Sequence, residues 1–341
     1  MRLVIDGRPL VGNRTGIGVH TAEFARRLPF DPPPLIASHA PIENRDGLEH
    51  CRFAVDRYPF GVAWQQFALP RIDADVVWGP HGTLPVTLKR PAVVTLHDFT
   101  SITMPWRHEL KTILSFDLFI ARSLELAHRI AAVSKRIADE AVRGFAVPPS
   151  KIELVPNGVD EFFSPATEEE GEEGDFILCV GTLEPRKGID DLVAVWQSLS
   201  PRPRLVLCGD PGWGRKPNLP DLEITGFVDK HTLRDLYRRA RAFVYPSRYE
   251  GFGIPPLEAL ACGAPVIATR TGAIPEYAKD AAVLVDPGDR DALRAAIVRV
   301  LADRGLRDEL RARGPERASH YRWDRSAAAM AELLREAARC A

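Results

Sequence analysis

The sequence lacks an excess of charge of either sign. Its 45 lysines and arginines nearly balance 46 aspartates and glutamates, which leaves a formal net charge of −1 at pH 7. A protein that binds nucleic acid normally carries an excess of positive charge to face the phosphate backbone. The balance therefore argues against nucleic acid as a partner.

Paired cysteines and long apolar runs are also missing. The five cysteines form no C-x-x-C pair, and several lie in apolar runs, where cysteine acts as a small buried hydrophobe in a reducing compartment. The start, MRLVIDGRPL, does not resemble a signal peptide, and no apolar run is long enough to span a bilayer. We therefore expect a soluble protein of the cytoplasm.

What the sequence does contain is an alternation of short β-branched runs with amphipathic segments. RLVID precedes a helical pattern over 17–28, DVVWG and AVVTLHD precede one over 108–127, and RIAAVS precedes one over 135–145. The rhythm then restarts with FILCVG and continues through RLVLCG, LEITG, AFVYPS, PVIAT and AAVLVD. Strands that alternate with helices predict parallel sheets with right-handed crossovers. A chain of 341 residues is long enough for two such domains.

Between the two runs lies an acidic segment, SPATEEEGEEGD, over 164–175. A block of like charge that is nearly free of apolar residues cannot bury surface, so it is typical of a solvated linker. We therefore predict an N-terminal Rossmann-like domain over 1–163 and a second one over 176–322. The segment 323–341 is predicted to be a helix that returns toward the first domain.

Two corners of the second domain have features of anion sites. In VGTLEPRKG a strand ends at Gly181 and a helix begins near Gly188, with Arg186 and Lys187 at the turn. A helix N-terminus presents free N–H groups and partial positive charge, and two cations add donors that suit phosphate. Taken alone, a cationic pair at a helix start is more often a solvated face.

The second corner lies in SRYEGFGIPPLEALACGAPV, over 247–266. Gly251 and Gly253 let the backbone approach a ligand closely, and the two prolines that follow suit a first helical turn. A diphosphate would suit both corners at once. Glu258, in the first turn of the helix, would then accept hydrogen bonds from the hydroxyls of a ribose, and Glu250 would hold hydroxyls beyond the far phosphate. For Glu258 alone, stabilisation of its own helix dipole is an equally good interpretation.

The stretch YPSRYEGFGIPPLEALACGAPVIATRTGAIPE resembles the E-x7-E signature of retaining family 4 glycosyltransferases. VGTLEPRKG, LVLCGDPGWG, ITGFV, DAAVLVDPGD and NRTGIGVHTAEFARRL are similar to further segments of that family, so the resemblance covers nearly the whole chain. It implies the GT-B fold, in which the parallel sheets of two Rossmann-like domains face each other across a cleft. The implied activity is transfer of a hexose from a nucleoside-diphosphate sugar to a hydroxyl of a glycan, lipid-linked or small-molecule acceptor, with retention at the anomeric carbon.

The resemblance also implies roles for individual residues. The positions implied in donor binding are Gly16, Gly18, Arg186, Lys187, Phe227, Val228, Glu250, Gly251, Phe252, Gly253, Ile254 and Glu258. The two cations, together with the loop at Gly16 and Gly18, would bind the diphosphate. The backbone at 227–228 would contact the nucleobase. Glu250 would bind the transferred sugar, assisted by the backbone amides at 252–254. His97, in LHDFT, would lie beside sugar and acceptor, although a core histidine at a strand end is the alternative. The candidate catalytic residues are His97, Glu250, Lys187 and Arg186.

The donor and the nucleophile follow less directly. Many family members have arginine after the strand glycine, where this chain has Thr182, so the diphosphate would rest mainly on the two cations. GTLEPRKG with GDPGW resembles a subgroup rich in mannosyltransferases, which favours GDP-mannose over UDP- or ADP-sugars. No carboxylate nucleophile is obvious, although Glu250 or Asp98 could be argued for. Same-face attack, in which the departing phosphate takes the acceptor proton, is the expected route.

No metal or other cofactor is implied. Asp73 and Asp75 have D-x-D spacing, but they precede a strand instead of ending it, and His81 and His97 lack a ligand cluster. Apolar residues within 104–116, with cations nearby, suggest core packing by default, or else an acceptor groove or a peripheral contact with the inner face of a membrane.

Three rival functions stay open from the sequence: a nucleotide-sugar 2-epimerase of the same fold, a dinucleotide-dependent oxidoreductase, and a non-catalytic sugar-nucleotide sensor. GNRTGIGVHTAE does not form G-x-G-x-x-G, which disfavours the oxidoreductase. An epimerase would change the sugar of the donor alone, whereas a sensor would bind the donor and never turn it over.

Overall fold

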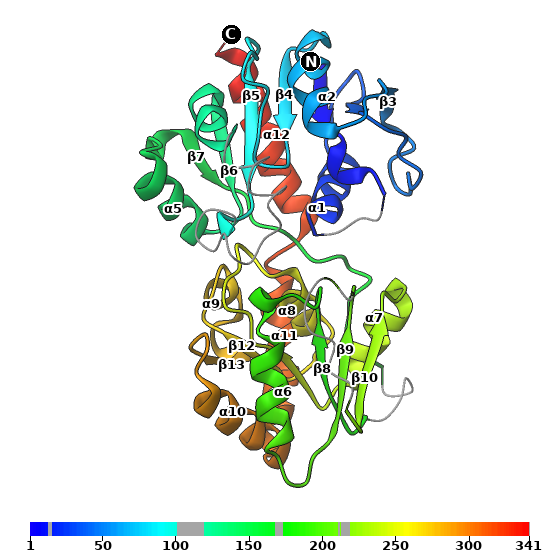
Figure 1. The fold of residues 1–341 in the computed structure, drawn as a ribbon, viewed down its shortest axis with the longest axis vertical. Coiled ribbons are helices and arrows are strands. Elements are labelled where there is room, and N and C mark those ends of the chain that lie inside the picture. The colour runs from blue at the N-terminus through cyan, green and yellow to red at the C-terminus, as the bar shows by residue number, and fades with distance from the viewer. Residues whose placement is uncertain (13–15, 101–118, 168–172, 211, 213–218, 341) are drawn as a thin grey trace. The chain divides into compact units, whose positions relative to one another are not determined.

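The chain folds into two units, each built around its own parallel sheet (Figure 1). The computed structural model describes residues 1–12, 16–100, 119–167, 173–210, 212 and 219–340. Unit 1 consists of Met1–Gly158 with Trp323–Ala341, and unit 2 consists of Val159–Arg322. The alternation of strands and helices in the sequence therefore corresponds to two separate α/β sheets.

Unit 1 contains a seven-stranded sheet with the order β3-β2-β1-β4-β5-β6-β7. Its strands are β1 (Leu3–Asp6), β2 (Leu35–Ser38), β3 (Arg52–Val55), β4 (Val76–Gly79), β5 (Ala92–Leu96), β6 (Arg129–Ala132) and β7 (Ile152–Leu154). All of its strand pairs are parallel. The inner strands β1, β4 and β5 are buried along their whole length, as expected for a parallel sheet covered on both faces.

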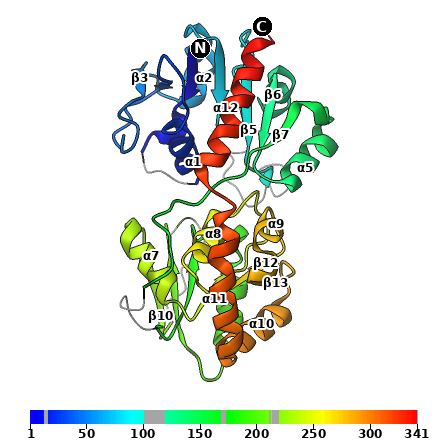
Figure 2. The same cartoon turned by 180° about the vertical axis from the view of Figure 1, so that it is seen from behind.

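The helices of unit 1 in the described residues are α1 (Gly16–Ala25), α2 (Gly61–Phe67), α5 (Lys135–Phe145) and α12 (Trp323–Arg339), with helical residues at 119–126 and short 3-10 turns at Arg8–Leu10, Leu69–Arg71 and Pro149–Lys151. The side chain of Ser134 caps α5 by accepting from the N–H of Ile137, and Ala146 ends it in the left-handed conformation. The C-terminal helix α12 packs along β4, β5 and β6 (Figure 2) and also contacts α1. Arg27, just after α1, pairs with Asp324 of α12 at 2.6 Å.

Unit 2 contains a six-stranded parallel sheet with the order β10-β9-β8-β11-β12-β13. Its strands are β8 (Phe176–Val180), β9 (Arg204–Cys208), β10 (Leu222–Gly226), β11 (Ala242–Tyr245), β12 (Val266–Thr269) and β13 (Ala282–Val285). Its helices are α6 (Ile189–Gln197), α7 (Lys230–Arg239), α8 (Ile254–Ala261), α9 (Ile274–Ala278), α10 (Arg290–Ala302) and α11 (Arg304–Ser319), with 3-10 turns at Pro185–Lys187 and Lys279–Ala281. The strand order reverses between β8 and β11, which makes the carboxyl ends of these two strands the topological switch point.

Several expectations fall partly or wholly outside the described residues. The apolar residues within 104–116 lie there, as does most of the helix expected over 108–127. The middle of the acidic segment, 168–172, lies there too, so its role as a linker stays a prediction. No helix in the described part of the chain is long and apolar enough to cross a bilayer.

Candidate functional site

The strand order of unit 2 brings together two segments that are far apart in the sequence. β8 leads into the corner that carries Arg186 and Lys187, and β11 leads into the segment that carries Glu250. β8 and β11 are parallel neighbours, with Ala242 opposite Ile177. Both segments therefore leave the same edge of the sheet, at the switch point where open α/β sheets bind ligands.

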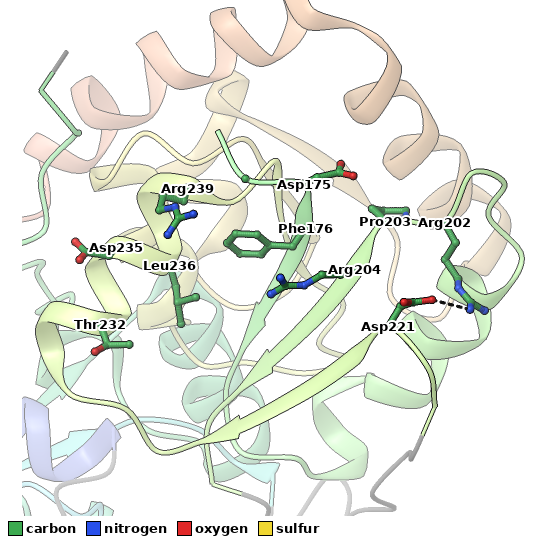
Figure 3. A pocket seen from close by; sticks show the side chains of 11 residues that line it. Asp175, Phe176, Arg202, Pro203, Arg204, Asp221, Thr232, Asp235, Leu236 and Arg239 are labelled. Atoms are coloured by element: carbon green, nitrogen blue, oxygen red, sulfur yellow. Dashed lines mark hydrogen bonds and ion pairs between the residues drawn. The ribbon is translucent and has the colours of Figure 1, made fainter. Parts of the chain in front are cut away.

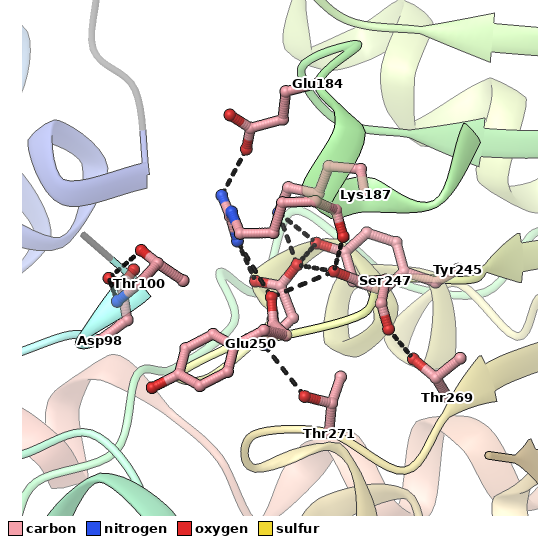
Figure 4. Close-up of polar contacts among 12 residues, drawn as sticks. Asp98, Thr100, Glu184, Lys187, Tyr245, Ser247, Glu250, Thr269 and Thr271 are labelled. Carbon is pink, nitrogen blue, oxygen red and sulfur yellow. Dashed lines mark hydrogen bonds and ion pairs between the residues drawn. The ribbon is translucent and has the colours of Figure 1, made fainter. Parts of the chain in front are cut away.

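A buried cluster forms where these segments meet (Figure 4). Oε1 of Glu250 accepts hydrogen bonds from Lys187 Nζ at 2.6 Å, from Ser247 Oγ at 2.6 Å and from the Tyr245 hydroxyl at 2.9 Å. Oε2 accepts from Arg186 Nη1 at a longer 3.4 Å. Glu250 is only 6% exposed, so this carboxylate is held almost entirely by side chains of the protein.

Charge keeps Glu250 ionised despite its burial. Burial alone would raise the pKa of Glu250, but the charges of Lys187 and Arg186 and the hydrogen bonds it accepts lower that pKa to about 2. Burial lowers the pKa of Lys187, and the neighbouring charge of Arg186 lowers it further. Because Oε1 already accepts three donors, Oε2 is the oxygen of Glu250 better placed to meet a ligand.

The sequence alone indicated an uncompensated positive corner, but in the structure its cations have acidic partners. Arg186 Nη2 donates to Glu184 Oε1 at 2.5 Å, and Nη1 donates to the carbonyl of Tyr249 at 3.1 Å. Two cations thus face two carboxylates, Glu184 and Glu250. Formal charge in the cluster is compensated, and an anion that binds here meets cations whose positions are already fixed by internal partners.

Gly188 locks the cationic corner against the segment that carries Glu250. Its φ of +68° lies in the left-handed region, and a Cβ at this position would lie 2.2 Å from the carbonyl oxygen of Pro246. The N–H of Arg248 donates to the carbonyl of Arg186 at 2.8 Å, so the backbones of the two segments also bond directly. The glycine is required here by close backbone approach.

The start of α6 carries acidic side chains of its own and has no side-chain cap. The first turn carries Asp190 and Asp191, which complement the helix dipole from within the chain. Asp191 is buried and pairs with Arg248 at 2.6 Å and with Arg290 at 2.7 Å. These ion pairs hold the first turn of α6 in place beside the corner that carries Arg186 and Lys187.

The start of α8 retains backbone donors. Gly253 caps it at a φ of +86° without a side-chain hydrogen bond, and the helix begins at Ile254. Pro255 and Pro256 have no N–H. Among the first three helical positions, Ile254 is therefore the one whose N–H can donate to a ligand. The carbonyl of Gly253 accepts from the Tyr277 hydroxyl at 2.7 Å, which holds the turn in place.

Glu258 lies one position beyond the first turn of α8, and not within it as the sequence suggested. A helix dipole acts mainly within its terminal turn, so the interpretation of Glu258 as a dipole partner is weakened. Oε2 of Glu258 accepts from the Tyr237 hydroxyl of α7 at 3.0 Å. Two further candidates of unit 2, Phe227 and Val228, follow β10 at the same carboxyl edge, and Phe227 is 81% exposed. Gly251 and Phe252 lie between Glu250 and the start of α8, and the side chain of Phe252 is buried.

The candidates of unit 1 lie at the carboxyl edge of its own sheet. Gly16 and Gly18 form the first turn of α1, and His97 directly follows β5. His97 Nε2 donates to the carbonyl of Pro80 at 2.8 Å, and its ring meets the ring of His20 edge-on, with centroids 4.5 Å apart. Burial lowers the pKa of His97, which favours a neutral imidazole.

The other carboxylates raised by the sequence have local partners. Asp98, next to His97, accepts from the N–H and the hydroxyl of Thr100 at 3.0 and 2.5 Å. Asp75 pairs with Arg2 at 2.8 Å, and Asp73 pairs with Arg2 and with Arg90. The D-x-D pair is thus a solvated ion-pair cluster. The described residues contain no group of three or more His, Cys, Asp and Glu side chains that could hold a metal ion.

Sequence and structure comparisons identify the family. The family model "Glycosyltransferase Family 4" matches residues 14–161, and "Glycosyl transferases group 1" matches residues 160–317. The O-antigen chain mannosyltransferase B of Escherichia coli is 30% identical over 369 residues, which cover 95% of this chain and 97% of that relative. The chain belongs to glycosyltransferase family 4. Members of this family generally need no metal ion, and they use a nucleotide sugar as the donor.

Solved structures confirm the GT-B fold of this glycosyltransferase. Anabaena Alr3699/HepE in complex with UDP-glucose has a TM-score of 0.81 at 19% identity and covers 98% of this chain and 100% of that one. WaaG, a glycosyltransferase involved in lipopolysaccharide biosynthesis, has a TM-score of 0.77 at 14% identity and covers 98% and 99%. A D-inositol 3-phosphate glycosyltransferase of Salinispora arenicola is 31% identical over 247 residues, 62% of this chain and 55% of that relative. The retaining glycosyltransferase activity follows from the family.

Several residues that shape the site of the glycosyltransferase were not expected from the sequence. Thr271 Oγ1 accepts from the N–H of Glu250 at 3.0 Å, and Thr269 Oγ1 donates to the carbonyl of Ser247 at 2.5 Å. A Cβ on Gly272 would lie 2.7 Å from the carbonyl oxygen of Glu250. The sequence signal for these residues was a concentration of hydroxyl residues and glycine at the carboxyl ends of two neighbouring strands, β11 and β12.

A pocket of about 660 Å³ lies at the opposite edge of the unit 2 sheet, at the amino ends of β8 and β9 (Figure 3). Its lining includes charges of both signs, and two of them, Arg202 and Asp221, pair with each other at 3.2 Å at one side of it. It therefore lies apart from the cluster of Lys187 and Glu250, which is at the carboxyl ends of the strands.

Acid should destabilise unit 1 through the half-buried His81. Burial, assisted by the charge of Arg8, lowers the pKa of His81 from 6.5 to about 4. Between pH 6.5 and about 4, the unfolded chain therefore binds a proton at His81 that the folded chain does not. The contribution of neutral His81 to the free energy of unfolding is present above pH 6.5 and is lost as the pH falls toward 4. We expect thermal unfolding to move to lower temperature over this range, and less steeply in His81→Gln. Identical pH dependence in the variant would contradict the role of His81.

Proposed function

We propose that this glycosyltransferase moves mannose from GDP-mannose to a hydroxyl of a glycan or lipid-linked acceptor, with retention at the anomeric carbon. The observation that carries the proposal is the buried Lys187–Glu250 pair, which holds a fixed cation and an ionised carboxylate together at the switch point of unit 2. Two relatives support mannose: the O-antigen chain mannosyltransferase B named above, and the O-antigen chain mannosyltransferase RfbU of Salmonella typhimurium, which is 30% identical over 64% of this chain.

Unit 2 would hold the donor along the carboxyl edge of its sheet. Lys187 and Arg186 would bind the diphosphate, with the N–H of Ile254 as a further donor at the start of α8. Glu258 would accept from the ribose hydroxyls, and the backbone at 227–228 would meet the base. The remaining lone pairs of Glu250, mainly on Oε2, would accept from a hydroxyl of the transferred sugar.

The reaction would draw on fixed charge more than on proton transfer by a carboxylate. When the bond between the anomeric carbon and the phosphate oxygen breaks, negative charge grows on the leaving diphosphate, and preorganised donors there contribute roughly 3–4 kcal/mol each. Glu250 is ionised but accepts three donors at Oε1, so it is better suited to orient the sugar than to attack it. The acceptor hydroxyl would attack from the face that the phosphate leaves, and the departing phosphate oxygen would take its proton.

Unit 1 would contribute His97 and the start of α1. Because Nε2 of His97 donates to the carbonyl of Pro80, Nδ1 is the ring atom that can accept from a hydroxyl of the sugar or acceptor. Gly16 and Gly18 would let the backbone of α1 approach the diphosphate. The domain limits 1–163, 164–175, 176–322 and 323–341 belong to the same proposal.

The function is tested by incubating the protein with GDP-mannose, UDP-glucose and ADP-glucose in turn. We expect the largest thermal stabilisation with GDP-mannose, and at most slow hydrolysis of it without acceptor. With a mannose-containing glycan acceptor, nuclear magnetic resonance should show an α-linked product. Greater stabilisation by another donor would refute GDP-mannose, and a change of the sugar while still attached to the nucleotide would identify an epimerase.

Glu258→Ala should weaken binding of GDP. A carboxylate that accepts from ribose hydroxyls contributes about 1.5–3 kcal/mol, which corresponds to roughly a ten- to hundredfold increase in Kd. Titration calorimetry with GDP measures this directly. The control is Glu223→Ala, which removes an exposed carboxylate of β10 that pairs with Arg204. Equal affinity in both variants and the parent would remove Glu258 from the nucleoside site.

A further inference from the structure

Two buried tyrosines each bond to one glutamate of the E-x7-E pair. The Tyr237 hydroxyl on α7 lies 3.0 Å from Glu258 Oε2, and the Tyr245 hydroxyl at the end of β11 lies 2.9 Å from Glu250 Oε1. The two tyrosines are 0% and 1% exposed. A carboxylate can only accept, so in both bonds the phenol O–H is the donor.

The rings of both tyrosines are fixed by the core of unit 2. Phe243 of β11 lies between them, with ring centroids 5.5 Å from Tyr237 and 6.1 Å from Tyr245. Phe163 packs against Tyr237 from the other side at 6.0 Å. A rigid ring in a close-packed core places its hydroxyl at a defined point, whereas a partly exposed glutamate such as Glu258 has several rotamers open to it.

The two hydroxyls hold different groups. Tyr237 fixes one oxygen of Glu258, which sets the plane of a partly exposed carboxylate. Tyr245 bonds to both Glu250 and Lys187, because its oxygen also accepts from Lys187 Nζ at 2.8 Å. Burial raises the pKa of both phenols well above 10, so each remains a proton donor wherever the enzyme is folded.

We propose that Tyr237 and Tyr245 are separate positioning residues, one for each end of the donor. Tyr237 orients Glu258 toward the nucleoside, and Tyr245 orients the Lys187–Glu250 pair toward the transferred sugar and the bond that breaks in the reaction. This assignment rests on the proposed function, since it assumes that Glu258 and Glu250 meet different parts of a sugar nucleotide.

The test is to compare Tyr237→Phe with Tyr245→Phe, which keep the rings and remove only the hydroxyls. Tyr237→Phe should raise the Kd for GDP and the KM for the donor by about three- to tenfold. These two constants should change more than kcat does. Tyr245→Phe should lower kcat by about tenfold or more and change the Kd for GDP by less than about threefold. Each variant is the control for the other, because both remove one buried hydroxyl from the same core.

A purely structural role predicts a different pattern. Equal changes of Kd and kcat in the two variants, or a change of Kd in Tyr245→Phe alone, would overturn the proposal. A double-mutant cycle adds an independent readout: in the Glu258→Ala background, Tyr237→Phe should have no further effect on the Kd for GDP. If Tyr237→Phe does not fold, Glu258→Gln weakens the same bond from the acceptor side and is measured instead.

The design also separates this proposal from the proposed function. Kd is measured with GDP by calorimetry and needs no turnover, so Tyr237 is tested even if mannose is the wrong sugar. The kcat of Tyr245→Phe is measured with whichever sugar nucleotide the parent enzyme uses. If the parent enzyme uses no sugar nucleotide, the proposed function is wrong. If the Kd for GDP is the same in Tyr237→Phe as in the parent, the role given to Tyr237 is wrong.

Discussion

Replacing Lys187 with methionine is expected to reduce transfer by about 10²–10³-fold and to lower the free energy of unfolding by about 3–5 kcal/mol. The loss of rate follows from removing a fixed cation aimed at the leaving diphosphate. The loss of stability follows because Glu250 is 6% exposed and would remain in the core without its nearest cation, which lies at 2.6 Å. Breaking one side of a buried ion pair leaves an uncompensated charge.

The pH dependence of this variant gives a second measurement. In the parent, the pKa of Glu250 is about 2, below its ordinary 4.5, so its contribution to stability is present above pH 4.5 and is lost as the pH falls toward 2. In Lys187→Met, the loss of this neighbouring charge should raise the pKa of Glu250 from that value, because burial then opposes fewer stabilising partners. The destabilisation caused by Lys187→Met should therefore be largest at neutral pH and should shrink in acid, where the carboxyl of the variant takes up a proton.

Two further variants sharpen the interpretation. Lys187→Met combined with Glu250→Gln removes both charges, and we expect it to recover more than half of the lost stability while remaining inactive. The matched control is Lys230→Met, because Lys230 pairs with Asp160 at a similar 2.7 Å but is 50% exposed, and its loss should cost less than about 1 kcal/mol. Urea denaturation of the four proteins measures these differences. A Lys187→Met variant as stable as the parent would refute the buried pair.

The general architecture could be predicted because buried parallel strands have a strong local signature. FILCV of β8 is a continuous apolar run, and AVVTL of β5 is apolar except for Thr95; both strands are buried at every position. The limits of α5, Lys135–Phe145, agree with the expected 135–145 because the helix has an amphipathic pattern and a serine at its cap. Such signals lie within ten or so residues and need no knowledge of the rest of the chain.

The edge of the unit 1 sheet was missed because its signal is weak. β3, Arg52–Val55, is half exposed at the sheet edge, and β2, Leu35–Ser38, is four residues long directly after a run of prolines. Short edge strands of this kind are stabilised by pairing with a neighbour more than by their own propensity. The seven-residue α2 between them and β4 is too short for a clear helical period.

The candidate site was predicted by residue but not by partner. The resemblance to the family selected Arg186, Lys187 and Glu250, yet it gave no reason to expect that the cations would bond to the glutamate. Lys187 and Glu250 are 63 residues apart, and their contact depends on β8 lying next to β11. Strand order is a property of the whole sheet, so residues such as Tyr245 and Ser247 acquire their roles only once that order is known.

Gly188→Ala should have the second large effect, and its cause is geometric. The φ of +68° costs an alanine about 1–2 kcal/mol, and its Cβ would lie 2.2 Å from the carbonyl oxygen of Pro246, which has to move. Forcing such a contact costs about 1–3 kcal/mol more. We therefore expect the free energy of unfolding to fall by about 2–5 kcal/mol.

Activity should fall further than stability alone explains. The backbone of the Pro246 segment carries Ser247 and Glu250, and the residue before Gly188 is Lys187. A shift of about 1 Å between the two segments separates the cation from the carboxylate, and misplacement on this scale can lower turnover by about 10²-fold. Measuring kcat well below the unfolding temperature of the variant isolates this effect from the loss of folded protein.

Gly288→Ala is the matched control for Gly188→Ala. Gly288 has a φ of +82°, but a Cβ there would meet nothing within 4 Å. The control therefore has the conformational cost of about 1–2 kcal/mol without the clash, and it lies in the turn after β13, away from the cluster. If the two variants lose equal stability and Gly188→Ala keeps its kcat, the close approach of Gly188 to Pro246 does not hold the two halves of the cluster together.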